Sequence, residues 1–141
     1  MDDITLKFDC EGIDWLRIHT VIYKAGLTAY PPELIKKAFE GSRAVIFIFN
    51  DSGVIATGRA LSDGAYQSVI YDVAVLPEWQ GRGIGRQIME SLLERISGQN
   101  IMLYASPGKE GFYERFGFRR LRTGMALFKK PREMQKKGLT D

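Results

Sequence analysis

The chain is poor in the residues that build disulfides and metal sites. It has one cysteine, Cys10, among 141 residues, so an internal disulfide is excluded and a reducing compartment, the cytoplasm, is expected. A single cysteine and a single histidine, His19, are too few ligands for a zinc site, and we expect no metal. Long apolar runs are missing too, since a stretch such as residues 44–49 is too short to cross a bilayer. We therefore expect no membrane partner.

The formal net charge is only +3, but basic residues gather near the end of the chain. Eight of them lie in the last 23 residues: Arg119, Arg120, Arg122, Lys129, Lys130, Arg132, Lys136 and Lys137. Such a cluster attracts an anionic partner, either coenzyme phosphates or RNA. It is also typical of a solvated strand edge and a frayed tail. We favour the second interpretation, because no aromatic residues lie between the tail charges, and we do not expect a nucleic-acid partner.

The length and composition are those of one globular domain. A chain of 141 residues can bury a sizeable core but is too short for two full domains. Its 45% hydrophobic content is ordinary for this class. We expect a single domain over residues 1–129, followed by a polar, basic tail over residues 130–141.

Hydrophobic periodicity predicts strands and helices in a mixed order. The expected strands are residues 4–8, 44–50, 54–61, 66–76, 101–105 and a terminal hairpin of 118–121 with 125–129. The expected helices are residues 13–25, 32–40, one through 88–96, and 107–116. Short turns join the second, third and fourth strands, which implies an antiparallel meander. The fold class is therefore α/β (α+β), a mixed and mostly antiparallel sheet of six to seven strands flanked by about four helices.

A strand, a proline and a glycine-rich turn run directly into a helix between residues 73 and 90. Closely spaced glycines let the backbone curl tightly and bring bare amides up to a ligand. The start of a helix favours an anion, because its first N–H groups are unpaired and its dipole is positive there. Two arginines add positive charge. The predicted pyrophosphate cradle consists of Gly81, Arg82, Gly83, Gly85 and Arg86.

The spacing of the glycines excludes two common nucleotide-binding loops. The dinucleotide pattern G-x-G-x-x-G would need a glycine where Arg86 stands, and the chain has no Gly-Lys-Ser or Gly-Lys-Thr of a phosphate loop. The turn does match the Q-x-x-G-x-G signature of the GNAT acetyltransferase superfamily, through Gln80, Gly83 and Gly85. About 30 residues later, residues 111–118 resemble that superfamily's F-Y-x-x-x-G-F segment. The chain therefore resembles GNAT N-acetyltransferases, and the predicted order of elements agrees with their fold.

This resemblance implies that acetyl-coenzyme A is the acetyl donor and that coenzyme A is a product. Amides of the glycine turn would hold the pyrophosphate, and Gln80 would brace the start of the loop. The strand at residues 73–75 would splay from its parallel neighbour and pair with the pantetheine arm. The N–H of Val73 would then face the acetyl carbonyl, and Val75 would contact pantetheine.

The resemblance also implies that Tyr113 protonates the departing thiolate, a transfer that is nearly balanced because phenols and thiols have similar pKa values. The alternative is that Tyr113 only packs, beside Phe112, Phe116 and Phe118. Many relatives carry an asparagine seven residues before this tyrosine, on the pantetheine arm. This chain has Ser106 there, whose hydroxyl makes a similar hydrogen bond but reaches less far.

The group that takes the proton from the amine is left open. Relatives that use a carboxylate or a histidine place it where this chain has Tyr71 or Val69. Strand alternation aims Asp72 at the opposite face, where it could pair with Arg59, unless a bulge re-aims it. Asp63, in the turn before this strand, is a further candidate at the mouth of the substrate site. A water relayed from Tyr71 or Asp72 is an equal alternative.

The acceptor pocket of this superfamily is walled by the first two helices and the loop between them. Here that loop carries Tyr23, Tyr30 and a Pro-Pro pair, a rigid aromatic wall that suits a flat or apolar amine. The alternative is that these tyrosines only pack the loop. Residues 58–64 and 70–77 are similar to the plant and cyanobacterial serotonin N-acetyltransferase-like branch, which implies an arylalkylamine acceptor.

Three functions therefore stay open at this point. The leading one is an acetyl-coenzyme A-dependent N-acetyltransferase that acts on a small primary amine. The others are a protein- or RNA-modifying acetyltransferase and a regulator that binds acyl-coenzyme A without catalysis. His19 is expected to be a partly packed helix residue and Cys10 an inert thiol. The C-terminal strand edge suits a homodimer.

Overall fold

The structure, a computed structural model, describes residues 3–141, so the first two residues of the expected domain lie outside the described part. The chain divides into two compact units. One ends at Leu103 and the other runs from Tyr104 to Asp141. The expected division at residue 129, between a domain and a tail, stays a prediction.

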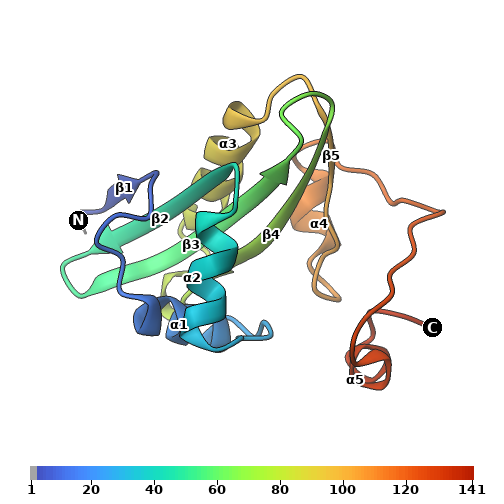
Figure 1. Cartoon of the computed structure of the whole chain (residues 1–141), viewed down its shortest axis with the longest axis horizontal. Helices are drawn as coiled ribbons and strands as arrows, with labels where there is room; N and C mark the ends of the chain where they lie inside the picture. Colours follow the sequence, from blue (N-terminus) through green and yellow to red (C-terminus); the bar gives the residue numbers. More distant parts are fainter. Residues whose placement is uncertain (1–2) are drawn as a thin grey trace. The chain divides into compact units, whose positions relative to one another are not determined.

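The first unit is a five-stranded sheet with helices packed on it (Figure 1). Its strands are β1 (Thr5–Lys7), β2 (Ala44–Asn50), β3 (Gly53–Ser62), β4 (Gln67–Val75) and β5 (Asn100–Met102). Its helices are α1 (Trp15–Lys24), α2 (Pro32–Glu40), the short 3₁₀ turn η1 (Pro77–Trp79) and α3 (Ile84–Arg95). The strands lie in the order β1-β2-β3-β4-β5, and every pair is antiparallel except β4 with β5. The expected mixed, mostly antiparallel sheet is confirmed, whereas the expected count of six to seven strands is wrong.

The first two helices begin where the sequence supplies a start signal. The carboxylate of Asp14 accepts hydrogen bonds from the N–H groups of Leu16 and Arg17, which have no acceptor inside α1. Helix α2 begins at Pro32, whose fixed φ and missing N–H suit a first helical position. Within residues 3–141, none of the helices combines the length and apolar character that crossing a membrane requires.

Helices cover both faces of the sheet. On one face, the rings of Trp15 in α1, Phe39 in α2 and Phe47 in β2 lie with their centroids 5.4–6.0 Å apart. On the other face, α3 packs against β3 at Gly58. The central strands are therefore buried from both sides, which explains the nearly continuous apolar run of β2.

The contact between α3 and β3 leaves no room for a side chain at Gly58. A Cβ atom there would lie 2.6 Å from Cγ2 of Ile88 and 3.2 Å from Cδ1 of Leu92. Both of these α3 side chains are fully buried. Glycine at this position therefore sets how closely the helix approaches the centre of the sheet.

The second unit contains two short helices, α4 (Glu110–Glu114) and α5 (Pro131–Lys136), and no strand among residues 104–141. The expected hairpin of residues 118–121 with 125–129 is wrong. Alternating apolar residues favour a strand only where a neighbouring edge supplies backbone hydrogen bonds, and no such ladder forms here. Instead the side chains of Met125 and Leu127 are fully exposed, at 98% and 102% of their reference areas.

The boundaries near the start of this unit also differ from expectation. The strand expected over residues 101–105 is shorter, since β5 ends at Met102. The helix expected from Pro107 is reduced to α4, because Ser106 to Lys109 form a turn closed by a hydrogen bond from the Lys109 N–H to the Ser106 carbonyl. The expected polar tail contains the helix α5. This helix begins at a proline, which is a helix-start signal, although the many charges of the segment favoured a tail without structure.

Replacing Gly58 by alanine should destabilise the first unit by about 1–3 kcal/mol, because the new methyl group overlaps buried α3 side chains. Thermal denaturation of the G58A variant measures this. The matched control is Gly111→Ala, since a Cβ at Gly111 in α4 meets nothing within 4 Å. An equal melting temperature for G58A and the unaltered chain would contradict the tight contact.

Candidate functional site

The glycine-rich turn has the backbone shape that the sequence predicts. Gly81 and Gly83 have φ values of +77° and +81°, in the left-handed region that L-residues rarely adopt. A Cβ atom on either glycine would meet nothing within 4 Å. Glycine is therefore required here by backbone conformation and not by lack of space. The turn itself stays open to a ligand.

The turn leads into α3 without a protein cap. Gly83 is the N-cap residue, and no side chain bonds to the helix start. The first intrahelical hydrogen bond is donated by the Gln87 N–H to the Gly83 carbonyl, at 3.2 Å. The N–H groups of residues 84–86, Gly85 among them, precede that bond and have no intrahelical acceptor. An uncapped, glycine-rich helix start of this kind suits a phosphate group.

Side chains around the turn fix its position and charge. The Gln80 side chain donates a hydrogen bond to the Val75 carbonyl at 3.0 Å, so the expected brace between the loop and the end of β4 is present. The Arg82 guanidinium lies 4.7 Å from the centre of the Trp79 ring. Arg86 is exposed and pairs with an acid one helical turn later. The turn thus carries two cations on its solvent side.

Strand β4 loses its parallel partner halfway along its length. Only residues 67–69 of β4 pair with β5, at Asn100–Met102. Within the described residues, the part of β4 from residue 70 to Val75 has no β5 partner. This agrees with the expected splay. Beyond residue 69, the β4 backbone therefore has no β5 ladder on that side.

The other edge of β4 carries a bulge. Thr57 pairs with Ala74 and Arg59 with Tyr71, so two β4 residues, Asp72 and Val73, face the single residue Gly58. Asp72 has φ +55° and is the one non-glycine residue within 3–141 that has a positive φ. The bulge ends the simple alternation of side chains along the strand.

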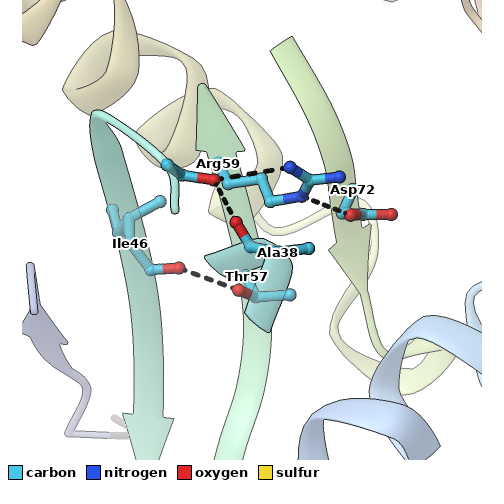
Figure 2. A network of polar contacts seen from close by, with 6 residues as sticks. Ala38, Ile46, Thr57, Arg59 and Asp72 are labelled. Atoms are coloured by element: carbon cyan, nitrogen blue, oxygen red, sulfur yellow. Dashed lines mark hydrogen bonds and ion pairs between the residues drawn. The ribbon is translucent and has the colours of Figure 1, made fainter. Parts of the chain in front are cut away.

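The bulge re-aims Asp72, which corrects the expected direction of this side chain. Its Oδ2 atom lies 2.6 Å from Nε of Arg59 (Figure 2). Arg59 is the cross-strand neighbour of Tyr71, and its guanidinium lies 5.2 Å from the centre of the Tyr71 ring. The expected pair of Asp72 with Arg59 is confirmed, but the pair lies on the same face as Tyr71 and not on the opposite one.

The Asp63 carboxylate is hydrogen-bonded within its own turn. Its Oδ1 atom accepts hydrogen bonds from the N–H groups of Ala65, Tyr66 and Gln67 at 2.7–3.1 Å. These bonds, with Ala65 foremost, lower the pKa of the Asp63 carboxyl. The turn also lies at the start of β4, whereas Val73 is near its end. Asp63 is thus a poor proton acceptor, and its contact with a substrate stays a prediction.

The two tyrosines expected in the loop between α1 and α2 are both exposed, but Tyr23 lies in the last turn of α1 and only Tyr30 lies in the loop. Tyr23 and Tyr30 are 70% and 57% exposed, so neither ring is committed to the core. The loop is held by His19, whose Nδ1 lies 2.8 Å from the Tyr30 carbonyl. A carbonyl only accepts, so Nδ1 carries the proton of this bond. The sequence predicts His19 only as a packed residue, and no local motif indicates its hydrogen bond to the Tyr30 carbonyl.

The remaining two expected residues lie in the second unit. Tyr113 is half-buried in α4, where its ring meets those of Phe112 and Phe118 edge to face, with centroids 5.0 and 6.1 Å away. Burial raises the pKa of the Tyr113 hydroxyl from its ordinary value of 10.0. Ser106 opens the turn before α4. Both the packing role and the acid role of Tyr113 therefore stay open, and its place beside the acetyl group is a prediction.

Comparison with known sequences decides the family. Residues 42–120, more than half of the chain, match the sequence profile described as "Acetyltransferase (GNAT) domain". The chain belongs to the GNAT acetyltransferase family. GNAT acetyltransferases use acetyl-coenzyme A as their acetyl donor, and the uncapped glycine turn of this chain fits its pyrophosphate.

Two relatives support this assignment, and one solved structure shares the fold. Serotonin N-acetyltransferase 2 of rice (Oryza sativa subsp. japonica) is 33% identical over 134 residues, which are 88% of this chain and 67% of the relative. GCN5-related N-acetyltransferase 1 of Arabidopsis thaliana is 30% identical over 118 residues, 80% of this chain and 60% of the relative. The chain thus spans about two thirds or less of the length of these relatives. A probable acetyltransferase from meticillin-resistant Staphylococcus aureus shares the fold, with a TM-score of 0.79 and 23% identity over 89% of this chain and 99% of that one.

Replacing Gly83 by alanine should weaken coenzyme A binding by about tenfold or more, because an L-residue resists a φ of +81° and the helix-start amides would move. Isothermal titration calorimetry measures the affinity. Gly98→Ala is the matched control, since Gly98 has φ +80° and equally open surroundings beyond the other end of α3. The two variants should lose similar stability. Equal coenzyme affinity for both variants would contradict the cradle.

Proposed function

We propose that this GNAT protein transfers an acetyl group from acetyl-coenzyme A to a primary amine, a small arylalkylamine in particular, by direct attack of the amine on the thioester. One observation carries the proposal. Within the first unit, β4 loses its β5 partner beyond residue 69 and carries a bulge, and η1 and the glycine turn then lead to the uncapped start of α3. A helix start that suits phosphate and a strand segment without a β5 partner are thus joined by a short stretch of chain.

The donor would be held by backbone groups. The N–H groups of the glycine turn and of the first turn of α3 would bind the pyrophosphate, with Arg82 and Arg86 beside them. The polar backbone of Val73 and Val75, and the hydroxyl of Ser106, would bind the pantetheine arm. When bound, the coenzyme supplies an acetyl group that is activated as a thioester. Binding by backbone explains why plain valines occupy positions 73 and 75.

The reaction needs one polarising donor and two proton transfers. The Val73 N–H would donate to the acetyl carbonyl and so favour attack by the amine nitrogen on its carbon. A nitrogen–carbon bond forms as the carbon–sulfur bond breaks. The Tyr113 hydroxyl, kept protonated by its raised pKa, gives its proton to the departing thiolate. The proton of the amine passes to water beside Tyr71.

The acceptor class follows from the loop that precedes α2. The exposed rings of Tyr30, in this loop, and of Tyr23, at the end of α1, offer an aromatic surface for a flat amine. Asp63, an exposed carboxylate, would attract the cationic form of that amine. The similarity to a serotonin N-acetyltransferase points to the same class. A cytoplasmic location and a homodimer stay predictions.

A protein-modifying acetyltransferase is the second candidate, and the charge of the second unit favours it. Residues 104–141 contain ten basic and four acidic residues. Two fully exposed apolar side chains, Met125 and Leu127, lie among them. A unit that carries both an excess of cations and exposed apolar groups would suit an acidic protein partner.

Thiol release from acetyl-coenzyme A in the presence of different amines tests the function. The panel contains tryptamine, serotonin, phenylethylamine, spermidine, amino acids and a lysine peptide. We expect the highest kcat/KM with the arylalkylamines. Turnover confined to the lysine peptide would favour the protein-modifying function. No turnover with any acceptor, together with tight binding of the coenzyme, would favour a regulator instead.

With the best amine, Tyr113→Phe should lower kcat by about 100-fold, because the thiolate loses its proton donor. The Kd for coenzyme A should change little. On the alkaline side, kcat of the unaltered enzyme should stay constant until the pH reaches the pKa of Tyr113, which is raised above its ordinary value of 10.0, and should then fall. Tyr66→Phe, at an exposed tyrosine in the β3–β4 turn, is the control. An unchanged kcat in Y113F would leave Tyr113 with packing alone.

A further inference from the structure

We infer that Asp72 is a positioning residue, not the base of the reaction: through Arg59 it fixes the β4 bulge that presents the Val73 N–H. The inference rests on the proposed function, because it assigns a role within that site. It concerns an ion pair that neither the glycine turn nor the family signature contains.

The backbone at Asp72 needs an anchor. Its φ of +55° lies in a region that L-residues adopt rarely, and aspartate and asparagine are among the few that tolerate it. Two residues, Asp72 and Val73, are fitted opposite Gly58, so the left-handed turn at residue 72 decides where the next N–H points. Loss of the anchor would let the strand return to regular pairing and turn the Val73 N–H away.

Arg59 provides that anchor, and it is itself held on several sides. Its Nε donates to the Asp72 carboxylate at 2.6 Å, and its guanidinium lies between the rings of Phe39 and Tyr71, at 5.7 and 5.2 Å from their centres. The side chains of Arg59 and Asp72 are 14% and 26% exposed. An ion pair shielded to this degree, with a cation between two rings, holds its geometry better than a solvent-exposed pair.

The pair of Arg59 with Asp72, named the clamp from here on, is connected to α2. Nη1 of Arg59 donates to Oγ of Ser42 at 3.4 Å, and that hydroxyl donates to the Ala38 carbonyl in α2 at 2.7 Å (Figure 2). Helix α2 directly follows the loop that carries Tyr30. The clamp therefore joins the element beside the proposed acceptor wall to the bulge that would hold the acetyl carbonyl.

The same contacts argue against Asp72 as the base. To take up the proton of the amine, its carboxylate would have to give up the charge that pairs with Arg59. That would release the bulge at the moment when the Val73 N–H is needed. A group that orients the reacting centre and a group that loses its charge in each turnover are conflicting roles for one carboxylate.

Three substitutions of Asp72 separate positioning from proton transfer. Asparagine tolerates the left-handed φ, and its amide oxygen still accepts from Arg59, so D72N should keep kcat within about threefold. Glycine adopts the φ but offers Arg59 no acceptor, so kcat of D72G should fall about tenfold. Alanine resists the φ and also offers no acceptor, so kcat of D72A should fall about thirtyfold or more. The Kd for coenzyme A should stay within about twofold in all three, because the α3 turn is untouched. The pH profile of kcat/KM should keep its shape in D72N.

A base would behave differently. If Asp72 took the proton, asparagine, glycine and alanine would lose kcat alike, and the acidic limb of the pH profile would disappear in D72N. Either result would overturn the inference. Arg59→Met should lose kcat as D72G does, because it removes the anchor and leaves the φ of residue 72 unstrained. The double variant R59M/D72G should lose little more than either single one, whereas fully additive losses would show that the pair does not act as a unit.

Melting temperatures make the test independent of the proposed function. D72N and D72G should have higher melting temperatures than D72A, because only alanine resists the left-handed φ. Asp9→Asn is the control, since Asp9 makes an exposed ion pair with Lys7 at 3.0 Å, and it should leave both turnover and melting unchanged. If the unaltered chain acetylates no amine, the proposed function fails. The melting of D72N above D72G, which lacks an acceptor for Arg59, then still decides whether residue 72 holds the bulge. Equal melting of all three variants would overturn the inference.

Discussion

The proposed functional site of this protein depends on where β4 loses its hydrogen-bonding partners. A strand in the middle of a sheet normally satisfies its backbone on both sides. Here the β5 ladder stops after Val69, and the β3 ladder is interrupted at residues 72 and 73. The Val75 carbonyl is taken by the Gln80 side chain instead of a strand. The proposed binding surface is this part of the β4 backbone, and the chain enters α3 after η1 and the glycine turn.

Helices on opposite faces hold this interrupted strand in place. On one face α3 presses against Gly58, the residue opposite the bulge, so the helix whose start would bind phosphate also packs behind the proposed reacting centre. On the other face, α2 reaches the bulge through Arg59 and Asp72. Changes in either helix would therefore alter the geometry of the same few β4 residues. This explains how a site made mostly of backbone atoms can be well defined.

The sequence predicts those parts of the fold and site that local chemistry decides. The glycine turn, the meander and the brace from Gln80 each follow from residues close together in the chain. The pair of Arg59 with Asp72 was predicted as well, but not its face, because the direction of Asp72 depends on a register shift between strands. The hairpin near Met125 was wrong for a related reason: a strand needs a partner edge, which no local pattern supplies. The contact from His19 to the Tyr30 carbonyl also joins distant residues and could not be foreseen.

The central claim is that acetyl-coenzyme A binds with its pyrophosphate at the start of α3 and its acetyl carbonyl at the Val73 N–H. Amide ¹H–¹⁵N spectra, recorded during separate titrations with coenzyme A and acetyl-coenzyme A, test it most directly. We predict that both ligands shift the signals of Gly83 and Gly85, that only acetyl-coenzyme A shifts Val73 strongly, and that Gly98 stays unchanged. Equal shifts of Val73 with both ligands, or unmoved signals at the start of α3, would contradict the account.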